Sequence, residues 1–188
     1  MRLAGLVIFA GAVQFWFCML LAECLYPGYS VSGNWISDLG VGPTAILFNL
    51  SVFLLGASLV AGAYLLREFR VFPIFLLLCG VGAMGVGIFP ERPHGRIHTA
   101  FSVVSFLFGS LSVIFSRRVM KPPLSHLALL LGLLSMTCLI LLGAGVYLHL
   151  GRGGMERMVA YPLLLWGVGL GGHLMGEASG SAGGARVL

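Results

Sequence analysis

Long apolar runs separated by short polar segments dominate the chain. The runs cover residues 3–25, 44–66, 71–89, 97–116, 124–150 and 158–175. Because the apolar core of a bilayer is about 30 Å thick, a helix needs about 20 such residues to cross it. The runs are continuous and do not alternate with polar residues, as the strands of a membrane barrel would. The pattern predicts an all-α, polytopic membrane protein with a compact bundle of six transmembrane helices.

The spacing of the runs predicts one transmembrane domain over residues 1–175. Most connections are short, so successive helices should pack as antiparallel neighbours. The first connection, residues 26–43, is the longest and is rich in turn-forming and aromatic residues. Residues 176–188 consist mainly of Gly, Ala and Ser, which predicts a flexible C-terminal tail.

Composition and charge fit a multi-pass protein of the cell membrane. Of the 188 residues, 59% are hydrophobic and 9% are charged, and the mean hydropathy is +1.02. The net charge is +5, but the basic residues lie in separate loops and form no stripe for a nucleic acid. One side of the predicted membrane carries Arg2, Arg67, Arg70, Arg117, Arg118, Lys121 and Arg186, and the other carries Arg92, Arg96, Arg152 and Arg157. Since cytoplasmic loops carry the excess of Lys and Arg, both termini are expected in the cytoplasm.

Polar side chains gather at the predicted outer end of the bundle, where the acidic residues Glu23, Asp38, Glu91 and Glu156 all fall. One hypothesis is an ion-pair latch that ties the first connection over the bundle, with Asp38 or Glu91 paired to an arginine of this end. The other is an outward-facing pocket whose arginines bind an anionic lipid headgroup. The candidate pocket residues are Asn34, Ser37, Asp38, Asn49, Glu91, Arg92, His94, Arg96, His98, His149, Glu156 and Arg157.

Two histidines suggest a metal site at the same end. His94 and His98 are four residues apart, so they share one face if a helix begins after Pro93. Glu91 precedes His94 by three residues, and His149 is predicted at the end of the fifth helix, which makes a His/His/His/Glu ligand set conceivable. The alternative is that these histidines form hydrogen bonds to loop carbonyls and lipid headgroups.

The same residues support two further hypotheses. The first is an intramembrane, lipid-modifying enzyme, metal-dependent or not, with Asp38, Glu91 and His98 as catalytic candidates and His94 as a further acid/base or metal-ligand candidate. The second is a b-type haem protein with His98 and His149 as axial ligands. Neither a metal nor a haem is favoured by the sequence.

Three segments carry a family resemblance. "NWISDLGVGPTAILFNLS" (34–51), "GIFPERPHGRIHTAFS" (87–102) and "GGMERMVAYPLLLW" (153–166) together resemble the domain-of-unknown-function 998 family of multi-span prokaryotic membrane proteins. The resemblance implies a six-helix membrane fold and an uncharacterised role. The matching residues are Ser37, Asp38, Leu39, Gly40, Phe48, Asn49, Pro90, Glu91, His98, Glu156, Arg157 and Trp166.

The leading interpretation is an integral membrane protein whose outward-facing pocket binds a lipid headgroup or a partner subunit. The expected partners are membrane lipids, together with a second copy of the chain or a different membrane subunit, and no nucleic acid. Whether the protein is an enzyme stays open at this stage.

Overall fold

The computed structural model describes residues 1–183, and this part of the chain is helical with no strand. The helices are α1 (Arg2–Leu25), η1 (Ile36–Gly40), α2 (Ala45–Leu65), η2 (Arg67–Phe69), α3 (Phe72–Ile88), α4 (Glu91–Ser116), α5 (Leu124–Gly143) and α6 (Gly151–Gly183), where η denotes a short 3-10 helix. Five of them are long and apolar enough to cross a membrane, and α3, with 17 residues, is shorter. The predicted all-α fold with six long helices is confirmed.

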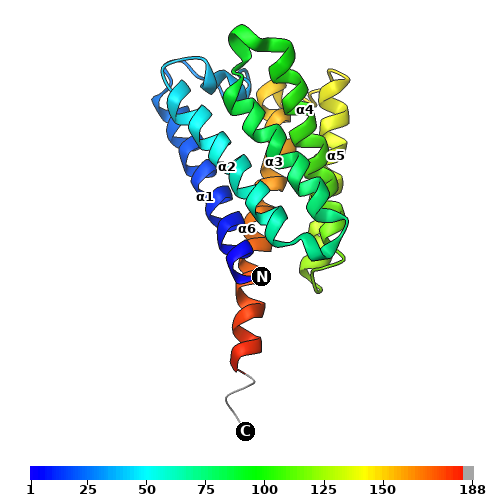
Figure 1. The fold of residues 1–188 in the computed structure, drawn as a ribbon. Coiled ribbons are helices and arrows are strands. Elements are labelled where there is room, and N and C mark those ends of the chain that lie inside the picture. Colours follow the sequence, from blue (N-terminus) through cyan, green and yellow to red (C-terminus); the bar gives the residue numbers. More distant parts are fainter. Residues whose placement is uncertain (184–188) are drawn as a thin grey trace.

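The six long helices form a closed ring. Each packs against the next one along the chain, and α6 returns to pack against α1 (Figure 1). Two glycine pairs allow close helix crossings, Gly5 with Gly171 between α1 and α6, and Gly56 with Gly80 between α2 and α3, because a Cβ on either glycine of a pair would meet the backbone oxygen of the other at 2.5–2.7 Å. The N-terminus and the far end of α6 lie at the same end of the ring (Figure 1).

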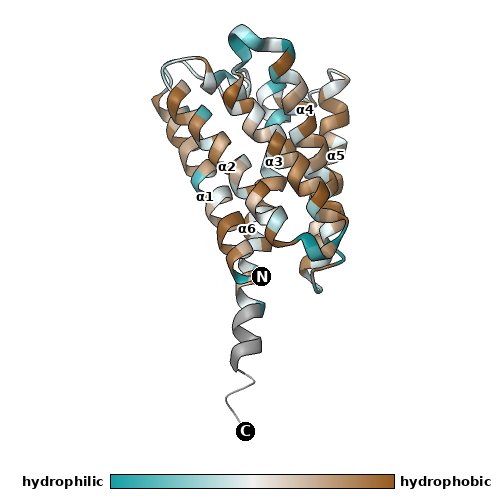
Figure 2. Ribbon diagram, in the orientation of Figure 1, coloured by the Kyte–Doolittle hydropathy of each residue, from teal (hydrophilic) through white to brown (hydrophobic). Residues whose placement is uncertain are grey.

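The outside of the ring is apolar along its length, while hydrophilic residues lie mainly at the two ends (Figure 2). Ile46, Phe17 and Ile140 are 85%, 68% and 65% exposed, which suits side chains that face lipid. Inside, Ser135 of α5 joins three helices. Its hydroxyl donates to the carbonyl of Val159 on α6 at 2.8 Å and lies 2.9 Å from the hydroxyl of Ser110 on α4.

Several predicted helix boundaries are wrong. The fourth helix begins at Glu91 and not at residue 97, although Arg92 and His94 have non-helical backbone angles that break its first turns. The fifth helix ends at Gly143 and not at residue 150, because Gly145, Leu148 and His149 adopt positive φ angles that a helix does not allow. Hydropathy does not register backbone angles, so the apolar residues after Gly143 extend the predicted span too far.

The sixth helix is longer than predicted at both ends. It begins at Gly151 and not at residue 158, and it continues through Pro162 and beyond residue 175 to Gly183. The tail predicted to be flexible from residue 176 is therefore helical as far as Gly183, which fits the helix-forming alanines among its small residues. The rest of that predicted tail, residues 184–188, lies outside the described residues.

Candidate functional site

Residues 26–44, here called the cap, close one end of the ring, here called the capped end. The helix η1 within the cap contacts α1, α2, α4 and α6, and its Leu39 is fully buried. The Thr44 hydroxyl donates to the Leu39 carbonyl at 2.9 Å, and the Asn49 amide donates to the Gly40 carbonyl at 2.9 Å. These contacts join η1 to the start of α2, so the cap is a packed part of the fold.

Arg157 of α6 is the main connection between the cap and the helices. It is 3% exposed, and its Nη2 lies 2.5 Å from Oε1 of Glu23 on α1 and 2.7 Å from the Tyr29 hydroxyl. Its Nη1 donates to the carbonyls of Val31 and Gly153, both at 2.9 Å. One guanidinium therefore holds α1, α6 and the cap together.

Tyr29 extends this network into the cap. Its hydroxyl accepts from Arg157 and donates to the carbonyl of Trp35 at 2.8 Å. Burial disfavours the charged phenolate and raises the pKa of Tyr29 to about 12, against the smaller opposing effect of Arg157. The phenol is therefore neutral at physiological pH and can serve as both donor and acceptor.

The first turn of α6 lies directly against the cap. Arg152 donates from Nε to the Gly33 carbonyl at 2.6 Å, and its guanidinium stacks over the ring of Trp35 with 5.6 Å to the centroid. The N–H of Gly153 donates to the carbonyl of Ser32 at 3.0 Å. A Cβ on Gly153 would overlap the carbonyl oxygen of Asn34, so only glycine fits at this position without a backbone shift.

A latch does join the cap to the helices, but the residues that form its ion pair differ from those predicted. Asp38 accepts at Oδ2 from the Trp35 N–H at 2.9 Å and from the Asn34 amide at 3.0 Å, which closes the first turn of η1. Glu91 accepts at Oε2 from the Ser37 hydroxyl at 3.2 Å. Within residues 1–183 neither carboxylate forms an ion pair, and the ion pair at this end joins Arg157 to Glu23.

The predicted metal ligands are not brought together. His98 is 5% exposed and its Nδ1 donates to the Phe89 carbonyl at 2.9 Å, whereas His94 is exposed against the edge of the Phe89 ring. The break at His94 removes the shared helix face, and His149 is exposed in the loop between α5 and α6. No group of three or more His, Cys, Asp or Glu side chains within the described residues is placed to hold a metal ion.

Of the remaining pocket candidates, Arg92 and Arg96 are exposed at the start of α4. Neither makes an ion pair with another described residue. The predicted binding of an anionic headgroup by these two arginines stays a prediction. Most of the other polar groups predicted to line the pocket are used in hydrogen bonds that hold the cap.

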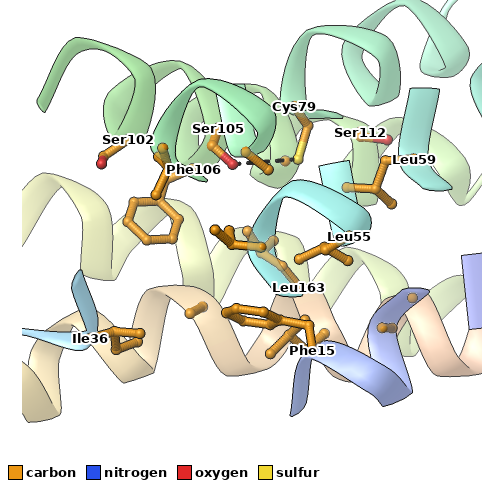
Figure 3. Close-up of a pocket in the computed structure, with 18 of the residues that line it drawn as sticks. Phe15, Ile36, Leu55, Leu59, Cys79, Ser102, Ser105, Phe106, Ser112 and Leu163 are labelled. Carbon is orange, nitrogen blue, oxygen red and sulfur yellow. Dashed lines mark hydrogen bonds between the residues drawn. The ribbon is translucent and has the colours of Figure 1, made fainter. Parts of the chain in front are cut away.

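A cavity of about 100 Å³ lies inside the ring beneath the cap and is here called the lumen. Its lining is mainly apolar and comes from the cap and from five of the long helices; the side chains include Phe15, Leu55, Leu59, Phe106 and Leu163 (Figure 3). Neither His98 nor His149 is among the lining residues, so the lumen does not place them as a pair of haem ligands.

Polar groups interrupt the apolar lining at a few points. Ser102 donates to the carbonyl of His98 at 3.0 Å, and Ser105 lies 3.9 Å from the sulfur of Cys79 (Figure 3). Ser112 is fully buried, and its hydroxyl has no hydrogen-bond partner among the side chains and backbone that the structure describes. At the capped end, Oε2 of Glu156 accepts from the Ile36 N–H at 2.5 Å, and Glu156 is 7% exposed.

The lumen was missed from the sequence, although one signal for it is present. Ser102, Ser105, Gly109 and Ser112 recur at the spacing of one helix face, and all four line the lumen. Such a stripe of small and hydroxylated residues in an apolar span indicates an inward face. The partners that surround it come from other helices, which the stripe does not identify.

Comparison with known proteins identifies the family to which the chain belongs. No curated protein and no solved structure matches the chain. The family model described as "Protein of unknown function (DUF998)" matches residues 9–173, which include all six long helices in whole or in large part. The chain therefore belongs to this family of uncharacterised function, as a membrane protein built on a ring of six helices.

Proposed function

We propose that the protein is an intramembrane binding protein that takes a small molecule with a short hydrocarbon body into the lumen. The observation that carries the proposal is an apolar cavity inside the ring whose lining includes two buried polar residues. These are Ser112, whose hydroxyl has no hydrogen-bond partner among the described residues, and Glu156. Binding pockets commonly combine an apolar lining with a few polar groups that orient the ligand. The lumen has this composition.

The size and lining of the lumen favour an apolar guest over water. A volume of about 100 Å³ is what about three water molecules occupy in the liquid, but each buried water molecule needs two to four polar partners. Side chains such as Leu55 and Phe106 offer none. Apolar cavities of comparable size stay dry and bind small apolar molecules.

The lumen is elongated along α4. Ser102 and Ser112, which both line it, are ten residues apart, or about 15 Å along the helix. In Figure 3, Ser102 and Ile36 lie at one end of the lumen, and Ser112 and Leu59 lie at the other. A narrow, elongated space suits an unbranched chain. A polar group on that chain would also recover the hydrogen bond that the Ser112 hydroxyl lacks.

Fluorescence of Trp166 tests the proposal. Trp166 is 5% exposed and lines the lumen, whereas Trp16 stacks on Tyr161 away from it. Two variants, each with a single tryptophan at one of these positions, report on the lumen and on a half-buried site outside it. We expect bromobutane, a short neutral chain with a quenching atom, to quench Trp166 with saturation.

A matched pair of substitutions provides the control. Ala83→Leu adds bulk inside the lumen, because Ala83 lines it and is 3% exposed, whereas Ala100→Leu adds the same bulk on an exposed face of α4. Ala83→Leu should weaken the quenching of Trp166 and leave that of Trp16 unchanged, and Ala100→Leu should change neither. If bromobutane quenches Trp166 only in proportion to its concentration in the membrane, in all variants alike, the lumen does not bind it and the proposal is wrong.

A further inference from the structure

Among the described residues, no cation pairs with the carboxylate of Glu156. It is 7% exposed and lines the lumen, and the hydrogen bond it receives comes from the neutral N–H of Ile36 at 2.5 Å. The neighbouring Arg157 directs its guanidinium to Glu23 and to the cap. Within the described residues, Glu156 forms no ion pair.

The other charged groups around Glu156 do not supply the missing positive charge. Asp38 of η1 and Glu91 of α4 are close enough to repel a negative charge on Glu156, and Arg157 attracts it. Because Arg157, the cation that acts on Glu156, is already paired with Glu23, its charge is shared between two carboxylates. A buried carboxylate in such surroundings is stabilised by a cation that brings its own hydrogen-bond donors.

We propose that the ligand of the lumen carries an ammonium group that pairs with Glu156 while its hydrocarbon chain lies against Leu55, Phe106 and Leu163. This inference rests on the proposed function, because it assigns the polar end of the molecule that the lumen binds. The chemical class is a short-chain primary amine in its protonated form. Its N–H groups donate to the carboxylate oxygens, and its chain extends along α4 toward Ser112.

Competition against bromobutane tests the inference in the variant whose single tryptophan is Trp166. Hexylamine, hexanol and hexanoate share one chain length and carry a positive, a neutral and a negative head at pH 7. We expect hexylamine to displace bromobutane at about a tenfold lower membrane concentration than hexanol, as a charge-assisted hydrogen bond implies, and hexanoate to compete less well than hexanol. Hexyltrimethylammonium, which has no N–H donor, should lose part of this advantage.

Two variants test whether the preference for hexylamine over hexanol comes from the carboxylate of Glu156. Glu156→Gln removes the charge at the lumen and should abolish the advantage of hexylamine over hexanol. Glu91→Gln removes a nearby carboxylate that does not line the lumen, so it should keep the preference.

The comparison of the three heads needs no substitution in the lumen, so it tests the inference even if Glu156→Gln fails to fold. Saturable quenching by bromobutane with equal competition by amine and alcohol would overturn the inference and leave the proposed function in place. An amine preference that survives Glu156→Gln would overturn the inference as well. Absence of saturable quenching would overturn both.

Discussion

Replacement of Arg157 by glutamine should detach the cap from the helix ring. The side chains of Arg157 and Glu23 are only 4% and 11% exposed, so the substitution leaves a buried carboxylate without its cation. Loss of one partner of a buried ion pair costs about 3–5 kcal/mol. The same guanidinium also bonds Tyr29 and the Val31 carbonyl, which places the expected loss of unfolding free energy toward the upper part of that range.

Arg152→Gln is the matched control. Arg152 lies in the first turn of α6, one turn before Arg157, and also bonds the cap, but it is exposed and donates to a single carbonyl, that of Gly33. Its loss should cost about 0.5–1.5 kcal/mol. Glu23→Gln combined with Arg157→Gln should cost less than the sum of the two single substitutions, because both remove the same ion pair.

Two measurements follow this effect in the purified full-length protein. Unfolding monitored by circular dichroism gives the change in stability, and hydrogen exchange of residues 26–44 reports whether the cap opens locally. We expect faster exchange in the cap for Arg157→Gln and near-normal exchange for Arg152→Gln. If the two variants lose equal stability and the cap exchanges at the wild-type rate in both, Arg157 does not hold the cap and the reasoning fails.

Three further predictions concern single contacts. Gly153→Ala should destabilise the protein by about 1–3 kcal/mol in thermal unfolding, because its Cβ overlaps the cap backbone, whereas Gly172→Ala, with open space around it, should be neutral or stabilising. The pKa of Tyr29 is raised to about 12 in the folded state, so the contribution of its hydroxyl to stability is complete below pH 10 and is lost as the pH rises through 12. The difference in unfolding free energy between wild type and Tyr29→Phe should therefore narrow from pH 10 to pH 12. A difference that stays constant would contradict this prediction. Ser135→Ala should cost about 0.6–1.7 kcal/mol in unfolding by removing the hydrogen bond that anchors α5 to α6, and no loss relative to the exposed Thr137→Ala would show that packing alone holds α5.

The hydrophobic pattern predicted the architecture well, since six continuous apolar runs leave few alternatives in a membrane. It failed where the backbone departs from a helix without a change in hydropathy. Residues 144–150 are largely apolar, yet this segment is not helical, and its Gly145, Leu148 and His149 have positive φ angles. The backbone angles of these residues depend on how the loop packs, and a count of apolar residues gives no information about that packing.

The polar residues of the capped end were located from the sequence, but their pairing was not. Four acidic and four basic side chains fall at that end, and hydropathy gives no reason to join Arg157 to Glu23 and to leave Asp38 with neutral donors. The lumen is harder still to predict, because its lining comes from side chains on five helices and the cap. It exists only after the ring has closed.

A crystal of the protein soaked with bromopropylamine provides the most direct test of the central claim, that the lumen binds a small molecule with a short hydrocarbon body. The anomalous signal of bromine locates the chain without reference to a fitted ligand. The account predicts a bromine peak inside the lumen, bounded by Leu55, Phe106 and Leu163, and density for the amine beside the Glu156 carboxylate. Bromine peaks confined to the lipid-facing surface, with none in the lumen, would contradict it.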